Sequence, residues 1–308
     1  MMVEVKCRNI LLIIIALTCI KVSAEAQVYI TEHKTSKTTK TAFSEYETTF
    51  TTYRQEDGEI FVDEFIVDME LPESGALDEV SEKAIREKIS SIVIGDVKET
   101  NPNNLIDRYI SEKYLSKYST QKITGNNECN DFITENKSKN PMLSDEMHWE
   151  PSHYGIITGK LIFHTNSFIS YSIIEKSCNA MTCIRKETAF VYDIINKRFL
   201  SENDFLIPEK DNDYLELIRS TMTRNQKLIY NKPDVNYNSN FYIDEYGITY
   251  VFNADKYLDE NDATIHVMLN PKYVRQMVKT ESIVYKFFNI GQVERAKAKK
   301  QNKAVAIN

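Results

Sequence analysis

The part of the sequence that says most about the fold is the stretch Asn240-Phe241-Tyr242-Ile243-Asp244-Glu245-Tyr246-Gly247-Ile248-Thr249-Tyr250-Val251-Phe252-Asn253. Its sequence is typical of two antiparallel strands joined by a hairpin at Gly247. The alternating apolar faces of that hairpin would be formed by Phe241, Ile243, Ile248, Tyr250 and Phe252. We expect glycine at the turn because the hairpin needs a positive φ there. The stretch predicts strands at 240–243 and 248–253, and a third β segment follows at 264–269.

Upstream of this hairpin, helices and runs of strands follow one another. Residues 59–71 alternate imperfectly in the β pattern, and Pro72 ends the run. Residues 77–92 carry apolar side chains at three- and four-residue steps, which indicates a helix that Gly95 ends. Its buried face would consist of Leu77, Val80, Ala84, Ile85, Ile89 and Ile92. A second helix is expected over residues 103–118.

From Tyr154 onward the hydrophobic period changes to two residues. Strands are expected on both sides of a turn at 164–167 and again at 189–195. An amphipathic helix begins near Tyr214, and Pro271 opens a short helix. Helices in series with runs of strands predict an α+β fold. We expect a mostly antiparallel sheet with helices packed on it, in two subdomains.

The composition is that of a globular chain with an acidic body. Of its 308 residues, 42% are hydrophobic and 27% are charged, which is close to the average for folded domains. Only 8 glycines occur, which argues against glycine-rich phosphate loops and most dinucleotide-binding folds. The formal net charge is −7, although residues 291–308 are basic. A negatively charged folded region attracts cationic partners, and it lacks the basic surface that nucleic-acid binding requires.

The N-terminus has the pattern of a secretion signal. Lys6 and Arg8 precede the apolar run 10–20, and small residues at 23–26 suit cleavage after Ala26, or after Ala24. The apolar run is about half as long as a bilayer span requires, which favours a cleaved signal over an uncleaved membrane anchor. We therefore predict export to the periplasm or the cell exterior, with no transmembrane span after cleavage. A lipid anchor through Cys19 is the alternative.

Three cysteines would remain after cleavage at Ala26. In an oxidising compartment, Cys178 and Cys183 could close a tight loop by a disulfide. Cys129 would then be free and buried, or paired elsewhere. A zinc site is not expected because no second cysteine pair has ligand spacing.

The hairpin stretch resembles the most characteristic block of the bacterial DUF3298 domain. The segments 192–205 and 267–274 resemble further blocks of the same domain, in the same order. The N-terminal strand and helix with Gly95, and the helix that carries Tyr109, Tyr114 and Tyr118, resemble the DUF4163 region that usually precedes it. Together these blocks cover roughly residues 59–280. One departure is that the family's glycine-rich loop corresponds here to Ser177–Cys183, which has neither the glycines nor the histidine.

The resemblance implies a binding or sensing role in the cell envelope and no catalysis. Family members form the extracellular part of lysozyme-binding anti-sigma factors and an accessory domain of peptidoglycan deacetylases. The domain organisation that follows is a signal peptide at 1–26, a threonine-rich arm or edge strand at 27–58, a DUF4163-like subdomain at 59–145, a DUF3298-like subdomain at 146–280, and a helix end with a basic tail at 281–308.

Two kinds of functional site are compatible with the polar residues. A ligand-contact surface could be formed by Tyr109, Tyr114, Tyr118, His148 and Trp149, since aromatic side chains with polar tips suit contact surfaces. Alternatively, Asp145, His148 and His153 could hold a metal ion in a hydrolase or deacetylase that acts on envelope glycans. Carboxylates at 146 and 150, and the group at 255–262, fit solvated faces better than catalytic pairs or a calcium site.

The favoured hypothesis is a secreted or periplasmic, non-catalytic binding module. Its ligand would be a protein or a cell-wall component, and the acidic body favours a cationic protein such as lysozyme. Neither a catalytic residue nor a cofactor is predicted.

Overall fold

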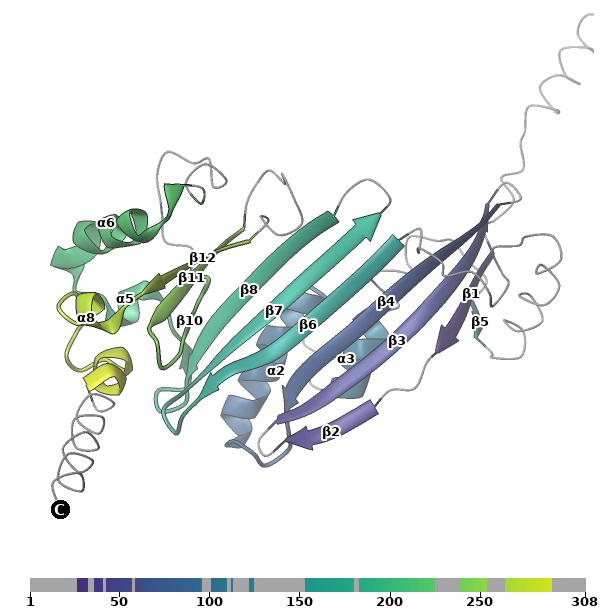
Figure 1. The fold of residues 1–308 in the computed structure, drawn as a ribbon. Coiled ribbons are helices and arrows are strands. Elements are labelled where there is room, and N and C mark those ends of the chain that lie inside the picture. The colour runs from purple at the N-terminus through teal and green to yellow at the C-terminus, as the bar shows by residue number, and fades with distance from the viewer. Residues whose placement is uncertain are drawn as a thin grey trace, which may run out of the picture.

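The computed structural model describes residues 27–32, 36–40, 43–56, 59–95, 101–109, 112, 122–124, 153–179, 183–224, 226, 239–253 and 264–289. These residues form one large sheet and one small sheet, each with helices packed against it (Figure 1). Most strand pairs are antiparallel, which confirms the predicted α+β class. Division into two subdomains stays a prediction.

The large sheet has nine strands in the order β5-β1-β3-β4-β6-β7-β8-β9, and β2 also pairs with β3. The pairs β4–β6 and β1–β5 are parallel, and the other strand pairs that the structure describes in this sheet are antiparallel. The strands are β1 (Gln27–Glu32), β2 (Ser36–Lys40), β3 (Phe43–Glu56), β4 (Glu59–Pro72), β5 (Lys122–Thr124), β6 (His153–His164), β7 (Phe168–Asn179), β8 (Cys183–Asp193) and β9 (Arg198–Phe199).

Helices α2 (Glu79–Val93) and α3 (Pro102–Tyr109) lie behind the large sheet in Figure 1. Asp78 caps α2 by accepting a hydrogen bond from the backbone of Ser81, and Gly95 follows its end with a φ of 108°. The prediction that Gly95 ends this helix is therefore confirmed. The core between these helices and the sheet contains Ile85 and Ile89 of α2, together with Phe65, Val67, Met69, Ile157, Ile169, Tyr171, Phe190 and Tyr192.

The small sheet contains β10 (Phe241–Ile243), β11 (Ile248–Asn253) and β12 (Thr264–Leu269), all antiparallel. The helices α5 (Glu202–Phe205), α6 (Asp211–Thr221) and α8 (Pro271–Val274) lie at this end of the molecule (Figure 1), as do the helical residues 283–289. A second core joins them to the apolar face of the hairpin, and Phe168 and Val191 of the large sheet also belong to it.

Two expectations need correction. Val80 is 55% exposed, because α2 turns Ile85, Ile89 and Val93 toward the sheet instead. Within the expected threonine-rich arm, β3 is an interior strand that pairs with β4 along its whole length. Ser44, Tyr46 and Thr48 are buried there because threonine favours strands and β4 supplies the apolar neighbours. The core also includes Ile283, Val284 and Phe288, which belong to the expected helix end at 281–308.

Hydrogen bonds from side chains connect the large sheet to the small sheet, since the described strands of one do not pair with those of the other. Asn240 donates to the carbonyl oxygens of Glu187 and Val251, and its Oδ1 accepts from Ala189 N at 2.5 Å. Asn253 accepts from Glu187 N and donates to Glu187 O. Ser170 Oγ donates to Ile243 O and accepts from Ile243 N. The backbone of β8 and β10 is thus paired by side chains at the junction, as buried peptide groups require.

Candidate functional site

The face of the large sheet that points away from α2 carries the candidate site, and we call it the open face. Over β3, β4 and β6, no helix or strand of the described residues lies on this face (Figure 1). The strand register places its side chains in rows that cross the sheet. One row runs through Glu47, Asp68, Thr158, Ile174 and Glu187, and the neighbouring row through Thr49, Ile66, Ile156, Lys176 and Arg185.

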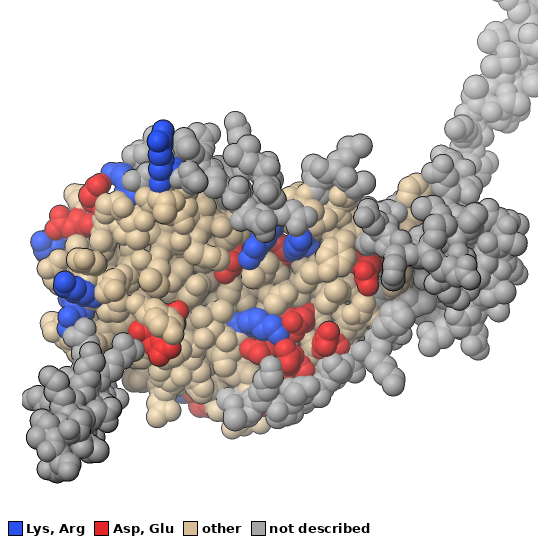
Figure 2. Space-filling view, in the orientation of Figure 1, with Lys and Arg blue, Asp and Glu red and all other residues tan. Residues whose placement is uncertain are grey.

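An acidic group, defined here as Glu45, Glu47, Asp68 and Glu70, lies on the open face around Lys160. Lys160 Nζ is 2.6 Å from Glu45 Oε1 and 2.7 Å from Asp68 Oδ1, so this lysine links β6 to β3 and β4. The side chains of Lys160 and Asp68 remain 31% and 28% exposed. Figure 2 shows acidic side chains gathered beside a basic one in this part of the molecule.

Within the acidic group, Glu70 connects β4 to β6 and β7 by hydrogen bonds. The pairing of β4 with β6 ends at Met69 and Gly159, and Glu70 Oε2 then accepts from the backbone N–H of Leu161 at 2.8 Å. Its carbonyl oxygen accepts from the hydroxyl of Tyr171 at 2.5 Å. Burial raises the pKa of Tyr171 well above its usual value, which keeps this hydroxyl protonated as a donor. Glu47, in contrast, is exposed on β3.

A second polar cluster lies where the open face meets the small sheet. Glu187 of β8 is buried, and its Oε1 accepts from Ser172 Oγ at 2.8 Å. Its Oε2 lies 2.9 Å from Nε2 of His266, on β12, and 3.9 Å from the guanidinium of Arg185. The carboxylate sits between the serine and the histidine, so His266 is not placed to activate Ser172 as a nucleophile. We interpret the cluster as a polar contact between the two sheets.

The Glu187 carboxylate makes stability depend on pH. Burial alone would raise its pKa, but the hydrogen bond and charge of His266 and the hydrogen bond from Ser172 outweigh burial and lower the pKa below 4.5. Because the pKa of this carboxyl group is lower in the folded than in the unfolded state, the ionised carboxylate stabilises the folded state at pH values above the pKa of the unfolded state. This stabilisation is lost as the pH falls through the pKa of the folded state. We therefore expect Glu187→Gln to cost about 1–3 kcal/mol near pH 7 and less below about pH 4.

Urea unfolding of both proteins over a series of pH values measures this difference. Glu209→Gln removes an exposed carboxylate from the segment before α6 and serves as the matched control. A free-energy difference between wild type and Glu187→Gln that stays constant from pH 7 to acid conditions would contradict the assignment.

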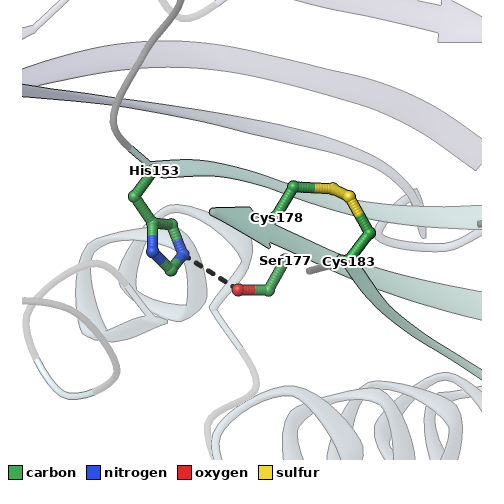
Figure 3. Close-up of a disulfide and its surroundings, with 4 residues drawn as sticks. All are labelled: His153, Ser177, Cys178 and Cys183. Atoms are coloured by element: carbon green, nitrogen blue, oxygen red, sulfur yellow. Dashed lines mark hydrogen bonds between the residues drawn. A yellow bond between two sulfur atoms is a disulfide. The ribbon is translucent and has the colours of Figure 1, made fainter. Parts of the chain in front are cut away.

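Cys178 and Cys183 form a disulfide at the tip of the β7–β8 hairpin, where they are directly paired. Figure 3 shows the bridge on one side of the sheet, and His153 and Ser177 on the other. His153 Nε2 is 2.9 Å from Ser177 Oγ, and the imidazole packs against Phe65 with a ring separation of 5.8 Å. His153 therefore points away from the open face.

Replacing both cysteines by serine is expected to lower the free energy of unfolding by about 2 kcal/mol. The closed loop is short, so the bridge removes little conformational entropy from the unfolded chain. Urea unfolding with and without a reductant measures the effect. Reductant should destabilise the wild type by a similar amount and leave the double variant unchanged. A response of the double variant to reductant would show that another bridge is responsible.

The predicted site residues are only partly described. Tyr109 is 7% exposed and belongs to the core around α3, which does not suit the predicted contact surface. Tyr114, Tyr118, His148, Trp149 and Asp145 lie outside the described residues. Within the ranges that the structure describes, no group of three or more His, Cys, Asp or Glu residues could hold a metal ion.

Sequence reasoning missed the residues that organise the open face. The alternating pattern of residues 59–71 already indicated that Asp68 and Glu70 lie on the polar side of a strand. Lys160 is distant in the sequence, and it comes close to them through the parallel pairing of β4 with β6. Glu187 and His266 come together through the contact between two sheets. No local pattern in the sequence indicates such partners.

Comparison with known proteins identifies a shared fold. No protein-family model and no curated protein matches the sequence. A crystal structure of a DUF3298 family member from Bacteroides fragilis aligns with 82% of this chain and 98% of its own, at 15% identity and a TM-score of 0.57. A DUF3298 family protein from Pseudomonas aeruginosa aligns over 82% and 94% of the two chains, at 8% identity and a TM-score of 0.41. The first similarity shows a common fold.

None of the helices in the described part of the chain combines the length and the apolar character that crossing a membrane requires.

Proposed function

We propose that this chain is an exported DUF3298 family protein, with a DUF4163-like region before the DUF3298 blocks, that binds a partner in the cell envelope without chemically changing it. The shared fold with a DUF3298 member and the blocks in residues 59–280 support the family. The signal-like residues 1–26 support export. The partner we propose is a cationic protein such as lysozyme, or a cationic cell-wall component.

The observation that carries this proposal is the acidic group on the open face. The group has four carboxylates, of which two pair with the single ammonium group of Lys160, so it is negative even with Lys160 counted. Glu45, Asp68 and Lys160 are each about a quarter to a third exposed. Partly buried charges are less screened by salt than fully exposed ones, and they focus the local field. Lysine and arginine side chains of a partner would therefore be attracted to this face.

The bonding of the carboxylates favours recognition over catalysis. Glu45 and Asp68 are bound to Lys160, and Glu70 is bound to the backbone of β6. A general acid or base needs a poised proton at the reacting atoms, whereas these three carboxylates are engaged in contacts that join the strands of the sheet. Such a fixed set of charges is suited to binding a complementary surface.

Titration calorimetry with lysozyme as a cationic probe tests the proposal. We expect a saturable complex at about 0.02 M salt that is at least tenfold weaker at about 0.5 M salt, because the Debye length shortens severalfold. A cationic protein of similar charge but different surface, such as cytochrome c, shows whether the binding is specific for lysozyme. Absence of heat and of complex at both salt concentrations would remove lysozyme as the partner.

A further inference from the structure

We propose that the basic C-terminal segment, residues 291–308, binds to the acidic group on the open face of its own chain. The charged residues of the segment are Glu294, Arg295, Lys297, Lys299, Lys300 and Lys303. Its net charge is therefore +4, whereas the acidic group with Lys160 counted has a net charge of −3. Opposite charges on two surfaces favour their association. The inference rests on the proposed function in one respect, since both assign cation binding to this face.

The described part of the chain ends close to the strand that carries Lys160. Phe287 lies two residues before Asn289, the last described residue, and the centre of its ring is 5.6 Å from that of Phe163 on β6. Phe163 is paired with Ser170 of β7, and Lys160 is paired with the residue two positions further along β7. Alternate residues of a strand point to one side, so Phe163 and Lys160 lie on the same face, about 7 Å apart along the sheet. The C-terminal segment therefore begins near the acidic group.

The segment is long enough to cross the acidic group, and its cations are suitably spaced. An extended chain spans about 3.3 Å per residue, so the stretch from Phe287 to Lys303 reaches about 50 Å. Arg295, Lys297 and Lys299 alternate with alanines, and in an extended chain they would lie on one side at intervals of about 7 Å. The two carboxylates on β3, like the two on β4, are also two residues apart and so have the same interval. An extended segment would therefore place several cations against carboxylates at once.

A second acidic region, the segment 209–216 before and within α6, is less suited to hold these cations. The side chains of Asp213 and Glu216 are 56% and 63% exposed, and each is bonded to a cation three residues away. The side chains of Glu45 and Asp68 are only 26% and 28% exposed. Partly buried carboxylates are less screened by salt than exposed ones, which favours the open face.

Zero-length cross-linking of the full chain tests the contact. A carbodiimide forms an amide between a carboxylate and a lysine amine that touch, and mass spectrometry then identifies the joined residues. We expect lysines of the C-terminal segment to be joined to the acidic group at least about tenfold more often than to Glu209, which is exposed before α6. The amide between Lys160 and Asp68, which are in contact, is the internal control for the reaction.

Equal amounts of ¹⁴N- and ¹⁵N-labelled chains in one reaction show whether a cross-link lies within one chain. We expect nearly all cross-links of the segment to join residues of the same isotope. Cross-links mainly between the two isotopes would assign the segment to a second copy of the chain. That result would overturn the proposal, as would cross-links spread evenly over exposed carboxylates, or none from the segment while the Lys160 control reacts.

Lysozyme binding separates this inference from the proposed function. Two triple variants change the net charge equally: Lys297→Glu/Lys299→Glu/Lys300→Glu in the segment, and Lys83→Glu/Lys210→Glu/Lys272→Glu at exposed lysines elsewhere. Because the segment competes with a cationic partner, we expect the first variant to bind lysozyme at least about threefold more tightly than the second at low salt. Cross-links to the acidic group without lysozyme binding would support the contact and remove lysozyme as the partner. Equal, measurable affinities of the two variants would show that the segment does not occupy the acidic group, and would overturn the proposal.

Discussion

Replacing Asn240 with alanine is expected to lower the free energy of unfolding by about 3 kcal/mol. The carboxamide donates to two carbonyl oxygens and accepts from the backbone of Ala189, and it joins β8 to the small sheet. Glu187 and Ala189 are buried, so the alanine variant leaves peptide groups of β8 without partners. Each such group costs about 1–3 kcal/mol, and water entering the gap recovers part of this. Urea unfolding measures the loss.

Asn240→Asp separates hydrogen bonding from packing. Aspartate has nearly the shape of asparagine, but its carboxylate cannot donate to the two carbonyl oxygens. We expect Asn240→Asp to destabilise the protein as much as alanine does at neutral pH. Asn196→Ala, at a turn residue whose side chain donates to Asp193 of the same turn, should cost less than about 1 kcal/mol. Equal effects at Asn240 and Asn196 would show that the carboxamide does not hold the sheets together.

The second large effect is expected for Gly247→Ala, at about 3 kcal/mol or more. A Cβ atom at this position would lie 2.1 Å from the carbonyl oxygen of Leu269, which is backbone and cannot rotate away. Either the hairpin or β12 must shift, and the core around Phe241 and Tyr250 then loses packing. Differential scanning calorimetry of the variant would show the loss as a lower midpoint temperature.

Gly75→Ala is the matched control for Gly247→Ala. Gly75 has a φ of 83°, and no atom lies within 4 Å of an added Cβ. Only backbone strain opposes this substitution, so we expect a cost of about 1 kcal/mol. If the two variants lose the same stability, the contact with Leu269 is not what makes glycine necessary at position 247.

The hairpin shows how far local sequence determines structure. Both strands and the turn follow from alternation and from Gly247, whose φ is positive as predicted, at 159°. The tighter constraint at Gly247, its contact with Leu269 of β12, involves a later strand. Likewise, Asn240 and Asn253 mark the ends of the stretch in the sequence, but their bonds to β8 depend on how the two sheets meet.

The open face was less predictable than the elements that form it. Alternation in residues 59–71 separates a buried side from a polar side, and α2 covers the buried side. The polar side becomes a candidate site only because β6 joins β4 in parallel after a long connection, which brings Lys160 to Asp68. Register between distant strands depends on the whole core, and a single sequence contains little information about it.

The central claim is that the acidic group on the open face binds a cationic partner. The most direct test compares lysozyme binding to Glu47→Lys and Glu209→Lys. Both residues are exposed, and both variants change the net charge equally, but Glu47 lies on β3 and Glu209 precedes α6 at the other end of the molecule (Figure 1). We expect Glu47→Lys to weaken binding about tenfold and Glu209→Lys to change it less than about twofold at low salt. Equal losses in the two variants, or no loss in Glu47→Lys, would contradict the claim.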